Sequence, residues 1–472
     1  MKAMNDTYDF IVIGGGSAGY AGASTAAVLG MRTLLIEGGR EVGGLCILRG
    51  CMPSKTLLET GHRAAAIREA AEFGLRAEYI GPNAAAIVAR KRRLIGEFAE
   101  YRRGQIETGR FDFARGTAAF TDPHTIEVHL EGGGLRRITG GAFLIATGSR
   151  IGGSKVEGLD ATGFWTSDDV LDADTIPESV CILGGGAIAL EIASYYAGLG
   201  VPVSVIQRSA QVLKEMDADV ADAVTAAMEK RGIPVFRDTR LLRVTATDAG
   251  KCVIFQHAGS ERTVTAAQIV SALGRGPVIT GLGLDLAGVK TARGILAEDT
   301  QQCGAPHLFA AGDVCGPHEV VHIAIAQGEL AARNAARVLG QLGGDLEHID
   351  YALKLFAVFT HPEVAAVGLT ERECIEKNIP HLAATYLFAD HGKSIVRGAT
   401  DGFVKLIAER ATRRLLGGAC VGPEASELIH EIVVALRFGA TAGQLADTPH
   451  YHPTLSEIWT YPAEELAAVQ RE

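Results

Sequence analysis

A glycine-rich turn between a short apolar run and a helical segment occurs twice in this chain. In the first copy the apolar run 8–13 precedes Gly14, Gly16 and Gly19, and an Ala-rich helical segment follows. The next strand ends on Glu37. In such a G-x-G-x-x-G pattern, glycines let the backbone approach a pyrophosphate, and the acid accepts hydrogen bonds from ribose hydroxyls. The first copy therefore predicts a dinucleotide site.

The second copy contains Gly184, Gly186 and Ala189 at the corresponding positions. Each copy is followed by a buried apolar strand that ends in a small turn, at 143–148 and at 269–274. This order predicts that the second unit is inserted into the first, and two such copies indicate two dinucleotide cofactors.

The ribose-binding acid is missing from the second copy. In the first copy the acid lies 23 positions after the first glycine, and the same interval in the second copy reaches neutral Gln207, followed by Arg208. A neutral residue does not repel the 2′-phosphate of NADPH, and cations at Arg208 and Lys214 would bind it. We therefore expect NADPH as the preferred nucleotide, with NADH use left open. The alternative is that both cations are ordinary surface charges.

Cys46 and Cys51 lie five positions apart around a glycine, a spacing that can reach disulfide geometry. Pro53 suits the first turn of a helix, whose N-terminus would stabilise a thiolate. These features predict a redox dithiol, with two buried structural thiols as the alternative. A zinc site is not expected, because no second Cys or His pair has the required spacing.

His452 lies next to Pro453, which we expect to start a helix, and Glu457 follows about one turn later. A carboxylate at that place can fix the imidazole tautomer and raise its basicity, as a general acid/base requires. His450 and His361 are interpreted as ordinary surface or core histidines.

The chain has 472 residues, enough for about three domains. Its net charge of -10, with one short basic run at 90–93, argues against nucleic-acid binding. No apolar run reaches the roughly 18 residues that a membrane span needs, so we expect a soluble, cytoplasmic protein. The expected domains are a first dinucleotide domain at 1–150, a second, nicotinamide-nucleotide domain at 151–275, the second part of the first domain at 276–348, and a C-terminal α+β domain at 349–472.

Taken together, these motifs resemble those of the FAD-dependent pyridine-nucleotide disulfide oxidoreductases, the family of dihydrolipoyl dehydrogenase, glutathione reductase and mercuric reductase. The family's motif G-G-T-C-x-N-x-G-C-x-P-x-K appears at 43–55 as GGLCILRGCMPSK. Further motifs match at Ala146–Gly148, Ala311–Asp313 and His452–Glu457, and the resemblance covers essentially the whole chain. It implies an α/β fold with two nested Rossmann-like domains and a C-terminal α+β dimerisation domain.

The resemblance also implies roles for single residues. Cys46 would attack the disulfide substrate, and Cys51 would contact the flavin. Lys55 would lie beside the flavin, paired with Glu191. The further residues assigned to FAD are Gly44, Ala118, Thr147, Gly148 and Asp313, and those assigned to the nicotinamide nucleotide are Gly274 and Arg275.

His452, with Glu457, would act on the active site of the partner subunit, so the resemblance implies a homodimer with shared sites. The motif also departs from the family pattern, with Leu45 and Leu48 in place of Thr and Asn and a cation at Arg49. We predict electron transfer from NADPH through FAD and the two cysteines to a small disulfide. The alternatives are an NAD-linked dihydrolipoyl dehydrogenase and a relative that reduces mercury, another metal or a quinone.

Overall fold

The computed structural model describes residues 6–39 and 41–469, and the chain divides into two compact units. Of the described residues, one unit comprises 6–39, 41–54, 89–153 and 274–350, and the other comprises 55–88, 154–273 and 351–469.

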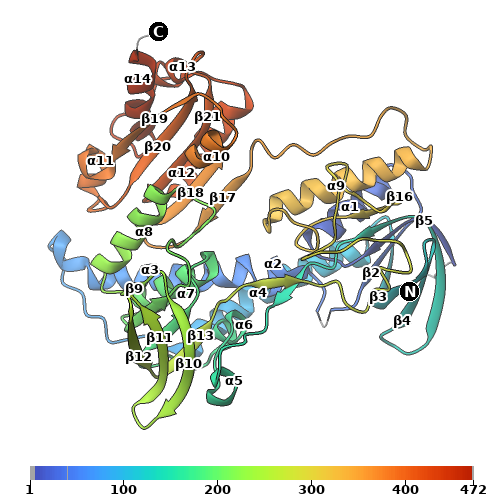
Figure 1. Ribbon diagram of the computed structural model, residues 1–472, viewed down its shortest axis with the longest axis horizontal. Coiled ribbons are helices and arrows are strands. Elements are labelled where there is room, and N and C mark those ends of the chain that lie inside the picture. Colours follow the sequence, from blue (N-terminus) through green and yellow to red (C-terminus); the bar gives the residue numbers. More distant parts are fainter. Residues whose placement is uncertain (1–5, 40, 470–472) are drawn as a thin grey trace. The chain divides into compact units, whose positions relative to one another are not determined.

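The first unit is built around a seven-stranded sheet (Figure 1). Its strands are β1 (Thr7–Ile13), β2 (Thr33–Glu37), β3 (Asp112–Asp122), β4 (Thr125–Leu130), β5 (Leu135–Ile145), β15 (Gln302–Cys303) and β16 (Ala305–Ala310). β1 pairs in parallel with β2 and β5, and β16 also runs parallel to β5. β1 and β2 are largely buried, which agrees with their near-continuous apolar sequences.

Two helices of this unit, α1 (Ser17–Val28) and α9 (Val321–Val338), pack against each other. The two helices approach so closely at Gly328 of α9 that only glycine fits there. A Cβ atom at this position would lie 2.1 Å from the Ala18 carbonyl oxygen of α1. The unit also contains α2 (Gly44–Leu48), most of α4 (Ala84–Glu107), and the antiparallel pair β6 (Ser149–Ile151) and β14 (Arg275–Pro277). α3 (Cys51–Arg68) starts in this unit and continues into the second.

The second unit contains a four-stranded parallel sheet in the order β13 (Gln268–Ser271), β7 (Val180–Leu183), β8 (Val203–Ile206) and β9 (Val235–Phe236). An antiparallel sheet accompanies it, formed by β10 (Arg240–Thr247), β11 (Gly250–His257) and β12 (Ser260–Ala266). The helices of this part are α5 (Leu159–Thr162), α6 (Ser167–Asp172), α7 (Ala187–Gly198) and α8 (Ala218–Lys230), with the short 3₁₀ helix η1 (Ala70–Phe73) after α3.

The rest of the second unit is a five-stranded antiparallel sheet in the order β17 (Leu355–Val358), β18 (Glu363–Gly368), β21 (Leu415–Gly422), β20 (Phe403–Glu409) and β19 (His381–Leu387). α12 (Ala425–Arg437) packs on β18 and β21, and α14 (Thr460–Ala468) packs on β19 and β20. The shorter helices are α10 (Glu371–Glu376), α11 (Gly392–Val396), α13 (Ala442–Ala446) and the 3₁₀ helices η2 (Phe388–Asp390) and η3 (Ser456–Trp459).

The predicted fold class is confirmed, with two nested Rossmann-like α/β domains and a C-terminal α+β domain. The sheet of the first unit is mixed, because β4 pairs antiparallel with β3 and β5. The prediction of a helix starting at Pro453 is wrong, because the next helical segment, η3, begins only at Ser456. The fully buried Trp459 donates its indole N–H to the Leu428 carbonyl at 3.1 Å, and this packing anchors the segment where the helix begins.

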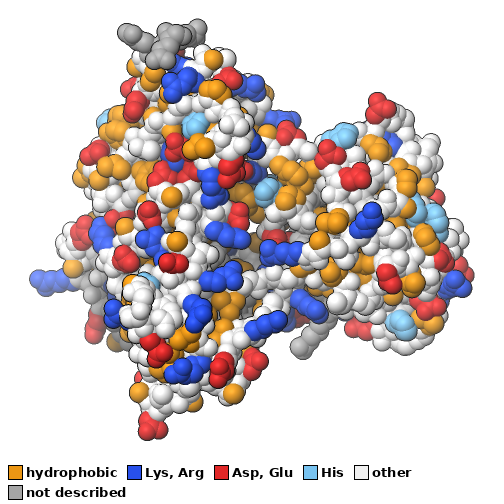
Figure 2. Space-filling view, viewed as in Figure 1, with side chains coloured by type: hydrophobic (Ala, Val, Ile, Leu, Met, Phe, Trp, Pro, Cys, Tyr) orange, Lys and Arg blue, Asp and Glu red, His pale blue; other side chains and the backbone are white. Residues whose placement is uncertain are grey.

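Acidic and basic side chains are interspersed on the face shown in Figure 2. Within the described residues, no helix combines the length and the apolar character needed to cross a membrane.

A buried lysine joins two parts of the second unit. Lys405 of β20 is 1% exposed and donates hydrogen bonds of 2.8 Å each to Asp217, Asp219 and Glu371. Asp217 and Asp219 lie at the start of α8, whereas Glu371 starts α10. The cluster therefore links the end of the 207–217 segment to the C-terminal sheet.

The charges of Lys405 and Asp217 contribute to the stability of the fold over a wide pH range. Burial disfavours the ammonium ion, but hydrogen bonds from the carboxylates outweigh it and raise the pKa of Lys405 above its ordinary 10.5. Burial works to raise the pKa of Asp217, but Lys405 and two backbone N–H groups lower it overall from 3.8. The stability that the charged Lys405 contributes is therefore fully present below the pKa that lysine has in the unfolded chain. It is lost as the pH rises through the higher pKa of Lys405 in the folded protein. The aspartate contribution is lost as the pH falls below 3.8.

We expect Lys405→Met to lower the free energy of unfolding by about 3–5 kcal/mol, because it leaves buried carboxylates without their cation. Urea unfolding of the holoenzyme at pH 7 measures the loss. The deficit should shrink as the pH approaches 4, since protonation relieves the repulsion among the carboxylates. The control is Lys230→Met, which removes a 65% exposed side chain paired with Asp401 and should cost less than about 1 kcal/mol. Equal losses in the two variants would contradict this account.

Candidate active site

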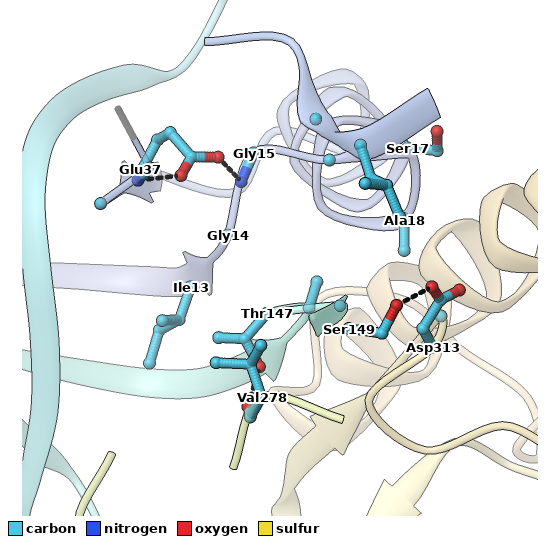
Figure 3. A pocket seen from close by; sticks show the side chains of 18 of the residues that line it. Ile13, Gly14, Gly15, Ser17, Ala18, Glu37, Thr147, Ser149, Val278 and Asp313 are labelled. Carbon is cyan, nitrogen blue, oxygen red and sulfur yellow. Dashed lines mark hydrogen bonds between the residues drawn. The ribbon is translucent and has the colours of Figure 1, made fainter. Parts of the chain in front are cut away.

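A cavity of about 730 Å³ lies within the first unit (Figure 3). This volume falls in the range of about 300–1,000 Å³ that is usual for cofactor pockets. The cavity is lined by the turn after β1, the end of β2, α2, the start of α3 and the turn after β5. The predicted FAD residues that line it are Gly14, Gly16, Glu37, Gly44, Ala118, Thr147, Gly148 and Asp313.

The Glu37 carboxylate is held at the end of β2 by two backbone N–H groups. Gly15 donates to its Oε2 at 2.7 Å, and Gly39 donates to its Oε1 at 2.6 Å. In Figure 3 the carboxylate lies beside the glycine turn. A carboxylate in this position can accept hydrogen bonds from ribose hydroxyls, as the motif predicts.

Glycine is required where backbone segments meet around the cavity. Gly14 has φ +107°, and a Cβ atom on it would lie 2.3 Å from the Ala146 carbonyl oxygen. Gly44 has φ +75°, and its Cβ atom would lie 2.5 Å from the Gly16 Cα. Gly19, which was also predicted, is not among the residues that line the cavity. It lies in α1 against the turn after β1, where an added Cβ would lie 1.8 Å from the Gly14 carbonyl oxygen.

A polar chain lies at another part of the cavity. Ser149 donates its hydroxyl to Asp313 Oδ2 at 2.6 Å and accepts from Arg275 Nε at 2.9 Å (Figure 3). Thr147 donates to the Val278 carbonyl at 2.7 Å. Ser149 and Val278 line the cavity and were missed by sequence reasoning. The position of Ser149 directly after the Ala146–Gly148 motif was the signal that could have identified it.

Gly274 and Arg275, which we assigned to the nicotinamide nucleotide, lie in the first unit. The Gly274 carbonyl accepts a backbone hydrogen bond from Gly152. The Arg275 guanidinium donates to both the hydroxyl and the carbonyl oxygen of Ser149. Their assignment to the nucleotide stays a prediction.

Both cysteines of the predicted dithiol line the same cavity as the flavin motif. Cys46 lies in α2, Cys51 is the first residue of α3, and both are half-buried. Cys51 therefore stands at a helix N-terminus, where the helix dipole favours a thiolate. Arg49, between them, lies 3.7 Å from Glu41, and both side chains are partly exposed.

The second glycine turn repeats the geometry of the first within the second unit. A Cβ atom on Gly184 (φ +121°) would lie 2.4 Å from the Ala272 carbonyl oxygen, and one on Gly185 would lie 2.9 Å from Gln207 Cγ. Gly186 precedes α7, and Ala189 is buried within that helix. Gln207 thus occupies the place that Glu37 has in the first unit, as the 23-residue interval predicts.

Two cations follow this turn. Arg208 is exposed, and among the described residues it makes no hydrogen bond or ion pair. Lys214 is also exposed and lies 3.5 Å from Glu215, whose carboxylate partly offsets its charge.

Lys55 of α3 forms the predicted ion pair with Glu191. Its Nζ donates to Glu191 Oε1 at 2.8 Å and to Oε2 at 3.0 Å, and it lies 4.5 Å from the centre of the Phe359 ring. The Phe359 backbone N–H also donates to Glu191, at 3.1 Å. These contacts fix both charges in one orientation.

His452 and Glu457 also meet as predicted. His452 Nδ1 donates to Glu457 Oε2 at 2.9 Å, and the imidazole is 79% exposed whereas the carboxylate is almost buried. This bond fixes the tautomer in which the Nε2 lone pair can accept a proton. His450, to which we gave no role, lies 2.6 Å from Glu431 through its Nε2 and is largely buried. His361 is half-buried, and its partial burial lowers its pKa to about 4.

Residues 8–328 match the family described as pyridine nucleotide-disulphide oxidoreductase, and residues 356–463 match the dimerisation domain of the same family. The chain belongs to the pyridine nucleotide-disulphide oxidoreductases. It is 33% identical to a dihydrolipoyl dehydrogenase of Chlamydia trachomatis, over 98% of this chain and 97% of that protein. It is 32% identical to a mercuric reductase of Bacillus cereus, over 96% of this chain and 70% of that protein.

Among solved structures, LpdA from Mycobacterium tuberculosis aligns with a TM-score of 0.85 and 28% identity, covering 97% of this chain and 99% of that one. Membership of the pyridine nucleotide-disulphide oxidoreductases implies FAD and a nicotinamide cofactor. The cavity fits FAD, because it combines a glycine turn at a helix N-terminus, an oriented acid at Glu37 and the carboxylate of Asp313.

We expect Gly44→Val to weaken FAD binding by about tenfold or more, because the added side chain would collide with the backbone of Gly16. Flavin absorbance after gel filtration, and the dissociation constant of FAD from fluorescence, measure the effect. The matched control is Gly96→Ala in α4, where an added Cβ would meet no atom within 4 Å. Full flavin content in Gly44→Val would argue against this cavity as the FAD site.

Proposed function

We propose that this protein is a flavoprotein disulfide reductase that uses NADPH to reduce a small disulfide. The observation that carries the proposal is that Cys46 and Cys51 line the same cavity as the FAD motif. FAD, when bound, would accept a hydride from the nicotinamide and pass two electrons to this pair of cysteines.

The reduced cysteines would then act in sequence. The Cys46 thiolate attacks one sulfur of the substrate, so that a mixed disulfide forms and the other sulfur leaves as a thiol. The Cys51 thiolate next attacks the sulfur of Cys46, which restores the Cys46–Cys51 disulfide and releases the second thiol. Two electrons and two protons thereby pass to the substrate. The position of Cys51 at the start of α3 supports its thiolate form.

His452 would supply the proton that the first leaving thiolate takes. Its exposed imidazole and the fixed Nδ1–H to Glu457 leave Nε2 directed to solvent and able to exchange a proton. By the family pattern, this histidine would serve the cysteines of the partner subunit in a homodimer, and the match of residues 356–463 to the family's dimerisation domain supports that assembly.

A second candidate is an NAD-linked dihydrolipoyl dehydrogenase, which the names of several relatives favour. It would run the same thiol chemistry in the opposite direction, from a dithiol to NAD. A stopped-flow screen of the NADPH-reduced protein against lipoamide, glutathione disulfide and other small disulfides, repeated with NADH, separates the candidates. Turnover of lipoamide with NADH alone would favour the dehydrogenase. Reduction of mercuric ion or a quinone that survives His452→Gln would favour a reductase of those substrates.

We expect Cys46→Ser to lower disulfide turnover by about 10³-fold or more, the scale on which loss of a nucleophile acts. The variant should keep the long-wavelength absorbance of the two-electron-reduced protein, because that band requires the Cys51 thiolate. Cys51→Ser should lose both turnover and the band. Stopped-flow absorbance measures both, with reduction of the flavin by NADPH as the control for folding. Full disulfide turnover in both variants would rule out the redox dithiol.

The preference for NADPH rests on the change from an acid to Gln207 and on the free guanidinium of Arg208 beside it. We expect Arg208→Ala to weaken NADPH binding by about 1.5–3 kcal/mol, the scale of charge-assisted hydrogen bonds, and to leave NADH nearly unaffected. Steady-state kcat/KM for the two nucleotides measures the preference, with the exposed Arg262→Ala as the control. A wild-type kcat/KM higher for NADH than for NADPH would contradict the proposal and favour the dehydrogenase.

A further inference from the structure

The Glu457 carboxylate has a histidine on each of its two oxygens. His452 Nδ1 donates to Oε2 at 2.9 Å, and His391 Nε2 lies 3.4 Å from Oε1. His391 precedes α11 and is fully buried, in contrast to the exposed His452. Among the described residues, His391 Nε2 makes no hydrogen bond of standard geometry, and its approach to Glu457 is a polar contact at 3.4 Å. Its buried nitrogen therefore faces the carboxylate at the long end of hydrogen-bonding distance.

The other side of the His391 ring determines which proton it carries. Nδ1 lies 2.8 Å from the hydroxyl of Ser394, which is also fully buried. A lone pair on Nε2 would repel an ionised carboxylate, so the favoured tautomer has its proton on Nε2 and accepts the Ser394 O–H at Nδ1. The ring is thereby fixed as a donor toward Glu457.

We propose that His391 is a positioning residue for the reaction: its Nε2–H keeps the Glu457 carboxylate oriented toward His452. This inference rests on the proposed role of His452 as the general acid/base. With one oxygen held by His391, the rotation of the carboxylate is restricted, and the other oxygen stays directed at His452 Nδ1. A carboxylate that is nearly buried also needs donors to remain charged.

The titratable groups around His391 come from three parts of the C-terminal domain. Glu457 and His452 face it from the segment that ends in η3, and Tyr461 of α14 lies with its ring centre 6.3 Å away. Tyr386 of β19 stacks on Tyr461, and its hydroxyl donates to the backbone of Asp390 beside His391. Burial lowers the pKa of His391 more than Glu457 raises it. His391 therefore stays neutral near pH 7.

Two substitutions separate the contact with Glu457 from packing. In His391→Gln the amide nitrogen can reach the position of Nε2 and still donate to Glu457. In His391→Asn the amide reaches only the position of Nδ1, so the contact with Ser394 can persist while the donor to Glu457 is lost. Exposed His430 provides a control, His430→Asn.

The first measurement is the pH dependence of carbethoxylation of His452 in the holoenzyme, read by peptide mass spectrometry, because the reagent attacks only the neutral imidazole. In His391→Asn the midpoint should fall by about half to one pH unit, since a Glu457 carboxylate that is no longer held against His452 stabilises the protonated imidazole less. The second measurement is disulfide turnover, which should fall about three- to tenfold while flavin reduction by NADPH stays unchanged. His391→Gln should recover most of both values.

The outcomes distinguish this inference from the proposed function. Equal midpoints in wild type, His391→Asn and His391→Gln would overturn it, as would a loss of turnover in His391→Asn accompanied by loss of flavin and no change of midpoint. If wild type turned over no disulfide at all, the proposed function would fail. The carbethoxylation midpoint would then still decide whether His391 acts on His452 through Glu457.

Discussion

The two candidate nucleotide sites depend on one constraint, the close approach of backbone segments at glycines where no side chain fits. Gly14 meets the carbonyl of Ala146, and Gly184 meets that of Ala272 at nearly the same separation. In each unit the turn after the first strand is thereby pressed against the turn after another parallel strand. The N–H groups at the start of the next helix are left to face the ligand, which is how such turns bind pyrophosphate.

Because the backbone is the same in the two copies, a single side chain can set the difference between their ligands. Glu37 accepts hydrogen bonds from Gly15 and Gly39, so its charge is fixed where ribose hydroxyls would lie. Gln207 packs against Gly185 in the equivalent place, but its amide donates to the backbone of Gln211 at 3.2 Å and carries no charge. The local field at the second turn is then set by cations such as Arg208, which is the physical basis of the proposed preference for NADPH.

Features with local causes could be predicted from the sequence, and features that depend on distant partners could not. The strand, turn and helix at 8–28, and the start of a helix at Cys51, follow from apolar runs, glycine spacing and Pro53. The long helix α4 was missed because its sequence is strongly charged and carries only a weak apolar stripe. Ser149 was missed because its role comes from Asp313, which lies 164 positions later in the chain.

His450 and His452 differ in burial, and this difference separates two candidate acid/base residues that the sequence alone does not separate. His450 and His452 are two positions apart, and each is paired with a glutamate. The side chain of His450 is 9% exposed and that of His452 is 79% exposed, so only the second can exchange a proton with a substrate in solution or on another subunit. The carboxylate behind the exposed histidine is in turn the one with a second, buried histidine on its far oxygen. An exposed imidazole with a rigid, water-shielded carboxylate behind it retains access to substrate and a fixed tautomer together, which are the two requirements of a general acid/base.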